Sequence, residues 1–170
     1  MPEVAVRRSR IGGLGVFAVR SLGAGELIRE LELGREITRD TPLRPGDGEY
    51  PEHCTVVDGR LFLVGSPDRY FNHACDPNAY LRFAPTRTEV IARRKIEEGD
   101  ELTIDYLINN AGGDSWPCRC GAPRCRGETH RSFFDLPEAL QREYLPLLAP
   151  WFLRRHSREL ERIASEPAGA

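Results

Sequence analysis

The segment Asn72-His73-Ala74-Cys75-Asp76-Pro77-Asn78 decides how the rest of this sequence is interpreted. Two amides, an imidazole and a thiol around a proline fit neither the period of a strand nor that of a helix. Pro77 also disfavours α geometry at Asp76, so we predict a tight, irregular turn. Taken alone, His73 in such a turn is more often a structural histidine than a catalytic one.

Two further motifs lie on either side of this turn in the sequence. Residues 101–106 (Glu-Leu-Thr-Ile-Asp-Tyr) alternate like a strand, and by themselves they fit an ordinary core strand with a tyrosine hydroxyl at the surface. Gly13-Leu14-Gly15 is a weak signal alone, because its glycines could serve only a turn between strands. It is not a dinucleotide-binding fingerprint, since the third glycine and the following helix are missing.

Three cysteines within eight residues, Cys118, Cys120 and Cys125, indicate a metal site. Thiolates packed this closely are most simply explained by zinc, which prefers four tetrahedral ligands. The fourth ligand must come from elsewhere, and four residues are candidates: Cys54, Cys75, His73 and His130. Five cysteines without an apolar signal segment at residues 1–10 argue against a disulfide framework and favour a reducing compartment.

The composition predicts one globular domain. The chain has 170 residues, of which 40% are hydrophobic and 29% charged, and its net charge is −2. No apolar run approaches the roughly 18 residues that a membrane helix needs, so we expect no membrane anchor. A slightly acidic chain lacks the basic face that drives binding to nucleic acid, so we expect no direct nucleic acid binding.

Hydrophobic patterning predicts a mainly β chain that ends in helices. Short β-rich stretches separated by turns run through the first 108 residues: Val4–Ser9, Val16–Arg20, Leu27–Leu31, 55–57, 61–64, 80–83, 89–93 and 101–106. Asp58-Gly59 favours a hairpin. From Leu136 onward apolar residues recur at helical spacing, and Pro146 and Pro150 are expected to split this part into two helices. These helices could pack on the β domain or offer a dimerisation or docking surface.

The motifs together, in this order, resemble those of the SET-domain protein lysine methyltransferases with a cysteine-rich post-SET segment. Four family motifs have counterparts here: residues 13–18, 69–78, 101–106 and 118–127. The resemblance implies a SET fold of small curved β-sheets, with a knot-like crossing where the Asn72 and Tyr106 segments pass each other. We expect a SET domain over residues 1–110 with a variable insert at about 33–53, a post-SET zinc segment over 114–130 and a C-terminal helical extension over 136–165.

The resemblance also implies roles for single residues. Tyr106 would be catalytic, with its hydroxyl beside the methyl group that S-adenosylmethionine donates. Seven residues would hold this cofactor: Gly13, Leu14, Gly15, Arg69, Asn72, His73 and Tyr106. One structural zinc would be bound by four cysteines: Cys75, Cys118, Cys120 and Cys125. Tyr70 would help to shape the pockets, and Trp116 could cover adenine or substrate or simply pack.

The implied activity is methyl transfer to a lysine amine of a protein or peptide substrate, and histones are the family's commonest targets. The alternative is a catalytically silent SET module that binds protein through its groove and zinc segment. A cytoplasmic, reducing location is expected, with nuclear or host-delivered action also open. Ile104 stands where the family often has Phe or Tyr, which predicts a channel that tolerates di- or trimethyl-lysine.

Overall fold

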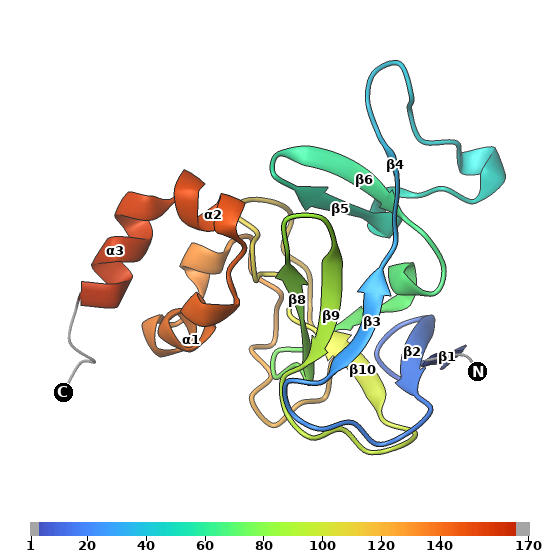
Figure 1. Cartoon of the computed structure of the whole chain (residues 1–170), viewed down its shortest axis with the longest axis horizontal. Helices are drawn as coiled ribbons and strands as arrows, with labels where there is room; N and C mark the ends of the chain where they lie inside the picture. Colours follow the sequence, from blue (N-terminus) through green and yellow to red (C-terminus); the bar gives the residue numbers. More distant parts are fainter. Residues whose placement is uncertain (1–3, 166–170) are drawn as a thin grey trace.

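Ten short strands form three small sheets in the computed structural model, which describes residues 4–165 (Figure 1). The first sheet has the order β1 (Val4–Arg8), β2 (Leu14–Ala18), β10 (Glu101–Ile104), β7 (Asn72–His73). The second has the order β3 (Leu27–Leu31), β9 (Thr88–Ala92), β8 (Ala79–Phe83). The third has the order β4 (Leu33–Glu36), β6 (Arg60–Val64), β5 (Cys54–Val57). The prediction of a mainly β fold built from small sheets is confirmed.

The first sheet places the two central motifs beside each other. Strand β10 runs antiparallel to β2 and parallel to β7, with Thr103 opposite Asn72 and Ile104 opposite His73. The amide of Ala74 continues the pairing with a 3.0 Å hydrogen bond to the carbonyl of Ile104. The segments that the resemblance expects to cross therefore lie side by side, and Tyr106 is the second residue after the end of β10.

The third sheet contains the predicted hairpin. Val57 pairs with Arg60 across the turn, and Asp58 and Gly59 both have positive φ, 51° and 77°. Glycine adopts this left-handed geometry without steric cost, which is why Asp-Gly marks such turns. The expected insert at 33–53 contains β4 and two 3-10 turns, Pro45–Asp47 and Pro51–His53, and the loop after β4 projects away from the sheets (Figure 1).

The strands enclose one hydrophobic cluster. Its buried side chains come from all parts of the β region: Val4, Val16, Ala18, Leu22, Ile28, Leu31, Val64, Phe71, Ala79, Val90, Ala92, Ile96 and Leu102. Removing these groups from water is the main force that holds the sheets together. Ile104 is half-buried and packs against this cluster, so the strand that leads to Tyr106 is fixed in the core.

Up to residue 165, where the described structure ends, the C-terminal part forms three helices, where two were expected: α1 (Glu138–Tyr144), α2 (Pro150–Arg155) and α3 (Ser157–Ser165). Pro146 does end α1, because it falls in a 3-10 turn at Leu145–Leu147. Pro150 occupies the first position of α2, where proline lacks no needed hydrogen bond, and a break at His156 separates α2 from α3.

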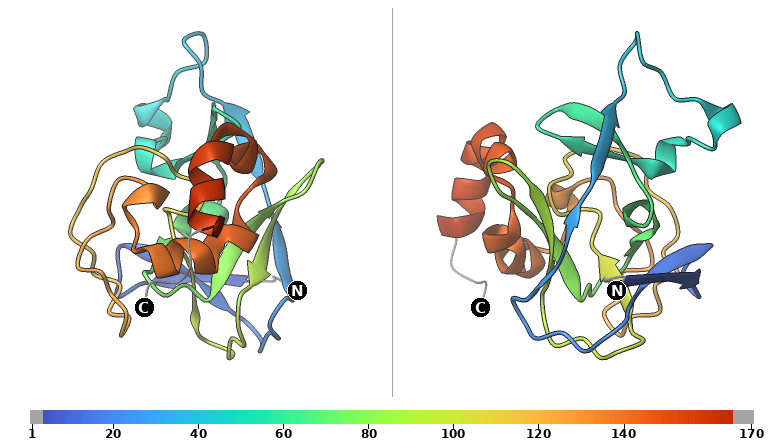
Figure 2. Two further views of the ribbon diagram at one scale, coloured as in Figure 1. Left: turned by 90° about the vertical axis from the view of Figure 1, so that its left-hand side faces the viewer. Right: turned by 45° about the vertical axis from the view of Figure 1, so that its right-hand side comes forward.

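The helices lie together on one side of the sheets (Figures 1 and 2) and share a second hydrophobic cluster. Its central side chains, Phe133, Tyr144 and Phe152, are fully buried, and Leu107 joins it directly after Tyr106. The expectation that the helices pack on the β region is thus confirmed. Among residues 4–165, no helix is long and apolar enough to cross a membrane.

Candidate active site and cysteine cluster

The side chain of Tyr106 is held at its hydroxyl and at its main chain. The hydroxyl donates a 2.7 Å hydrogen bond to the carbonyl of Phe71, and the main-chain amide donates to Nδ1 of His73 at 3.2 Å. The residue as a whole is 38% exposed, but its hydroxyl lies inside the protein. Burial there raises the pKa of Tyr106 to about 12. At neutral pH the phenol is therefore protonated, and it can orient a neighbouring group but is a poor base.

His73 is buried and acts as a connector between the turn and β10. Its ring lies 5.3 Å from that of Tyr106, and its Nε2 atom is 3.5 Å from the Sγ atom of Cys75. Burial lowers the pKa of His73 to about 4, so the ring is neutral near pH 7. Because Nδ1 accepts the amide of Tyr106, the ring proton belongs on Nε2 and faces the sulfur. This geometry supports the structural role for His73.

Asn72 ties the glycine loop to β10. Its Nδ2 group donates to the carbonyl of Leu14 at 2.9 Å, to the carbonyl of Gly12 at 3.3 Å and to Oε1 of Glu101 at 2.7 Å. Glu101 in turn accepts a 2.9 Å hydrogen bond from Ser9. A Cβ atom at Gly15 would lie only 2.3 Å from the same carboxylate, so any larger residue there would displace the Glu101 side chain.

These motifs meet at a pocket of about 350 Å³. Its lining combines the start of the glycine loop, the turn, Tyr106 and the cysteine segment (residues 114–130): Ile11, Gly12, Asn72, His73, Tyr106, Trp116, Pro117, Cys118, Arg119 and Thr129. The ring of Trp116 lies 6.4 Å from that of Tyr106 and is 46% exposed. Gly13, Leu14, Gly15 and Arg69 do not line it; the glycine loop adjoins it through Asn72, and Arg69 lies over the Tyr70 ring at 5.6 Å.

Four cysteines gather beside this pocket. The Sγ atoms of Cys75, Cys118, Cys120 and Cys125 all lie within 4.8 Å of one another, and those of Cys75 and Cys118 are 3.6 Å apart. A tetrahedral zinc with bonds of about 2.3 Å requires sulfur–sulfur distances of about 3.8 Å, so the four thiols fit such an ion. Of the four candidates for the fourth ligand, Cys54, His73 and His130 are not in the group, which leaves Cys75.

The loop geometry around the thiols explains why they converge. The amide of Cys118 donates to the carbonyl of Gly127 at 2.9 Å, and the amide of Cys125 donates to that of Ala122 at 2.9 Å. The amide of Arg126 points at the Sγ atom of Cys75 at 3.4 Å, a donor that would stabilise a thiolate. All four cysteines are free of disulfides.

Several residues of this region were not found from the sequence. Glu101 and Ser9 brace the glycine loop, and Asp105 accepts two hydrogen bonds from the guanidinium of Arg126, at 2.8 and 3.1 Å. The only sequence signal for Glu101 and Asp105 is that they belong to the same strand motif as Tyr106. Nothing local marks Ser9, because its partner lies 92 residues away.

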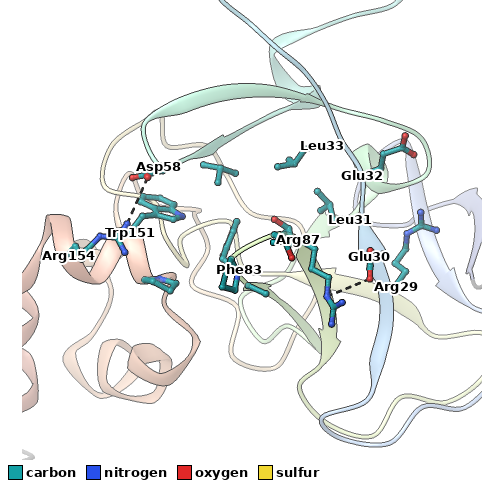
Figure 3. Close-up of a pocket in the computed structure, with 16 residues that line it drawn as sticks. Arg29, Glu30, Leu31, Glu32, Leu33, Asp58, Phe83, Arg87, Trp151 and Arg154 are labelled. Carbon is teal, nitrogen blue, oxygen red and sulfur yellow. Dashed lines mark ion pairs between the residues drawn. The ribbon is translucent and has the colours of Figure 1, made fainter.

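A larger groove of about 910 Å³ lies elsewhere (Figure 3). Its walls are formed by β3, the start of β4, the β5–β6 turn, the β8–β9 turn and α2. Ion pairs between Asp58 and Arg154 and between Glu30 and Arg87 lie at its rim. None of the residues predicted for catalysis, cofactor or metal lines it. The smaller pocket is therefore the candidate active site.

Comparison with known families agrees with this geometry. Residues 13–107, more than half of the chain, match the family model of the SET domain. The stretch begins at the glycine loop and ends directly after Tyr106. The chain therefore belongs to the SET-domain family.

Similar proteins are histone-lysine N-methyltransferases by name. Human histone-lysine N-methyltransferase 2B is 34% identical over 138 residues, which cover 72% of this chain and 5% of that protein. The H3 lysine-36 specific histone-lysine N-methyltransferase of Candida albicans is 42% identical over 135 residues, which cover 72% of this chain and 16% of that protein. The chain thus spans only a small part of these relatives.

A solved structure of a candidate histone methyltransferase from Plasmodium falciparum is also similar. It is 22% identical, with a TM-score of 0.48, and the match covers 61% of this chain and 92% of that one. The family assignment rests on residues 13–107 and does not need this match.

Proposed function

We propose that this chain is a protein-lysine N-methyltransferase that uses S-adenosylmethionine and acts on a lysine side chain of a protein, with histone tails as the first substrates to test. One observation carries the proposal: the Tyr106 hydroxyl is fixed on the Phe71 carbonyl at the edge of a pocket that Asn72 and His73 also line. The names of the relatives support the substrate class.

The pocket suits such a cofactor chemically. Trp116 offers an aromatic face for a purine ring, and the main-chain carbonyl of Gly12 offers an acceptor for an ammonium group. We assign Gly13, Leu14, Gly15, Asn72 and His73 to the surroundings of the cofactor, with Arg69 further out. When bound, S-adenosylmethionine supplies a methyl group on a sulfonium, which a neutral lysine amine attacks in line.

The protein's own residues then have two tasks. A lysine amine has a pKa of about 10.4 in water, so it must be desolvated and lose its proton before it can attack. Because Tyr106 stays protonated and donates to Phe71, its oxygen still has lone pairs that accept an N–H of the amine. Tyr106 therefore aligns the nucleophile and does not remove the proton, which leaves with water. Alignment of this kind accounts for much of the rate in reactions without a covalent intermediate.

We assign one structural zinc to Cys75, Cys118, Cys120 and Cys125. Four thiolates leave no open position for chemistry, so the ion would serve only to hold the cysteine segment against the turn that carries His73. We keep the expected division into a SET domain over 1–110, with its insert at 33–53, a zinc segment over 114–130 and a helical extension over 136–165. Free thiols at such a site suit a reducing compartment.

A methyl-transfer assay tests the proposal. The zinc-loaded protein is incubated with labelled S-adenosylmethionine and with core histones or a lysate of the source organism, and the modified lysines are located by mass spectrometry. We expect label on lysine residues and far less label with the Tyr106→Phe variant. A parent protein that binds the cofactor but transfers no label to any substrate would favour the alternative, a silent SET module that only binds protein.

A further inference from the structure

Two adjacent residues at the end of α1 are connected to the cysteine segment on both sides of Cys125, Glu143 directly and Tyr144 through Asp105. The Tyr144 hydroxyl donates a hydrogen bond to Asp105, which also accepts one from Arg126. The Glu143 carboxylate accepts a hydrogen bond from Arg124. Helix α1 belongs to the C-terminal extension, which contributes no residue to the pocket described above. These contacts therefore connect a part of the chain without an assigned role to the wall of the candidate active site.

The first contact runs through Asp105, the residue before Tyr106. Its carboxylate is almost fully buried and accepts the hydroxyl of Tyr144 at 3.2 Å, in addition to two hydrogen bonds from Arg126. Tyr144 is fully buried, and burial raises its pKa, so the hydroxyl remains a donor. Arg126 also reaches the carbonyl of Cys75 at 3.4 Å. The buried carboxylate thus joins the helix, the strand end that carries Tyr106 and the cysteine segment.

The second contact lies nearer the surface. The carboxylate of Glu143 forms an ion pair with Arg124 at 3.2 Å and another with Arg93. Arg93 in turn binds Asp76 at 3.3 Å and the carbonyl of Pro77 at 3.2 Å, both in the turn that carries Cys75. Glu143 therefore bridges the cysteine segment and this turn from outside.

A metal ion cannot supply this restraint by itself. Within the segment the ion would bind only Cys118, Cys120 and Cys125, and it would join them to the rest of the protein through the single residue Cys75. Apart from its main-chain ends, a segment held by the ion alone would be fixed at this one point and could pivot about it; the contacts of Arg126 and Arg124 restrict that movement. The segment's other residues, among them Trp116, Pro117 and Arg119, form one wall of the pocket, so a pivot would open that wall.

We propose that Tyr144 and Glu143 are positioning residues that fix the cysteine segment as the closed wall of the cofactor pocket. This inference rests on the proposed function, because it assigns the pocket to S-adenosylmethionine. The helical extension then acts as a brace that sets cofactor affinity, and it does not touch the reacting groups.

The test compares four variants with the parent, all zinc-loaded. Tyr144→Phe deletes only one hydroxyl, Glu143→Gln and Arg124→Gln each remove one side of the surface ion pair, and the double variant Tyr144→Phe/Glu143→Gln removes both contacts. Glu138→Gln is the matched control, because Glu138 lies on the same helix but, among the residues that the structure describes, pairs only with Arg142. Leu160→Ala in α3 is the control for lost stability, because Leu160 is buried in the helical cluster.

Two measurements are made well below the unfolding temperature. The dissociation constant for S-adenosylmethionine is measured by titration calorimetry, and zinc release is followed as transfer to a coloured chelator. In the double variant we expect a cofactor dissociation constant raised roughly tenfold, the order of effect that one lost charge-assisted hydrogen bond gives, and zinc release faster by a similar factor. Each single variant should shift both measurements in the same direction, and Glu138→Gln should shift neither.

A kinetic comparison separates positioning from simple destabilisation. Loss of folded protein lowers the apparent kcat, whereas an open pocket wall raises the KM for the cofactor. We expect a lower apparent kcat in Leu160→Ala and a higher KM for the cofactor in the Tyr144, Glu143 and Arg124 variants. The proposal is wrong if these three variants keep the parental cofactor affinity and zinc release, or if Leu160→Ala reproduces their pattern. If the parent binds no S-adenosylmethionine, the proposed function fails and zinc release alone decides whether α1 holds the segment.

Discussion

The hydroxyl of Tyr106 donates a 2.7 Å hydrogen bond to the main-chain carbonyl of Phe71. Phe71 is buried in the β core and directly precedes Asn72, so the carbonyl cannot move independently of the turn. This bond uses the only proton of the phenol and leaves its oxygen lone pairs to face the pocket. The phenol is thus oriented before any substrate arrives.

Tyr106→Phe is predicted to remove most methyl transfer. The change deletes the oxygen that aligns the amine but keeps the ring that lies beside His73, so cofactor binding should stay within severalfold of the parent. We expect kcat to fall about 100-fold or more, as is usual when a group that acts in the transition state is lost. Single-turnover transfer and cofactor titration measure the two quantities. Parental transfer by this variant would contradict the assigned role.

Cys75→Ser is predicted to lose the metal. Cys75 is the one ligand outside the 118–125 segment, so its loss leaves three thiols that cannot complete a tetrahedron. Elemental analysis should find about one zinc per chain in the parent and little in the variant. Cys54→Ser serves as the matched control, because Cys54 lies in β5 and outside the cluster. Full zinc content in the Cys75 variant would remove this residue from the site.

The rate of transfer is predicted to rise with pH. The reactive amine must be neutral, and its pKa in water is about 10.4, so kcat/KM should increase from pH 7 toward pH 10. Burial raises the pKa of Tyr106 to about 12, so this phenol stays protonated over the same range and causes no decrease in kcat/KM.

A peptide with a less basic lysine analogue identifies the titrating group. If the substrate amine titrates, the whole profile moves to lower pH with the analogue; if a group of the protein titrates, the profile stays in place. A rate that falls between pH 8 and 10 while the protein remains folded would mean that a protonated side chain is needed.

Ile104 is predicted to allow more than one methyl group on the same lysine. It lies at the end of β10, two residues before Tyr106, and carries no hydroxyl that could restrain the amine or hold a water molecule. Mass spectrometry of an exhaustively methylated peptide should therefore show di- or trimethyl-lysine. Ile104→Tyr should shift the product toward monomethyl-lysine, and Ile104→Val should not. A parent that stops at one methyl group with fresh cofactor present would contradict the inference.

The local features of this site could be predicted from the sequence, because short motifs encode them. The Asp58-Gly59 hairpin, the irregular turn at Asn72 and the cysteine cluster follow from turn chemistry and ligand spacing. The choice of Cys75 as fourth thiol needed either the family resemblance or the fold, because Cys75 is 43 residues from Cys118.

The long-range contacts could not be predicted in this way. Asp105 and Tyr144 are 39 residues apart, and the carboxylate also binds Arg126, 21 residues away. Each of these residues has an ordinary local explanation as part of a strand, a helix or a loop, and only packing of the helices on the sheets brings them together. The third helix was missed because the break at His156, which separates α2 from α3, has no proline or glycine in the sequence to mark it.

The position of Leu107 limits where the chain can be truncated. It directly follows Tyr106, is the last residue of the family match, and is buried in the helical cluster with Phe133, Tyr144 and Phe152. A fragment cut at that boundary would expose an apolar side chain next to the catalytic candidate and would remove the partner of Asp105. We therefore expect the smallest part of this chain that folds with an ordered Tyr106 to include its C-terminal helices, well beyond the segment by which the family is recognised.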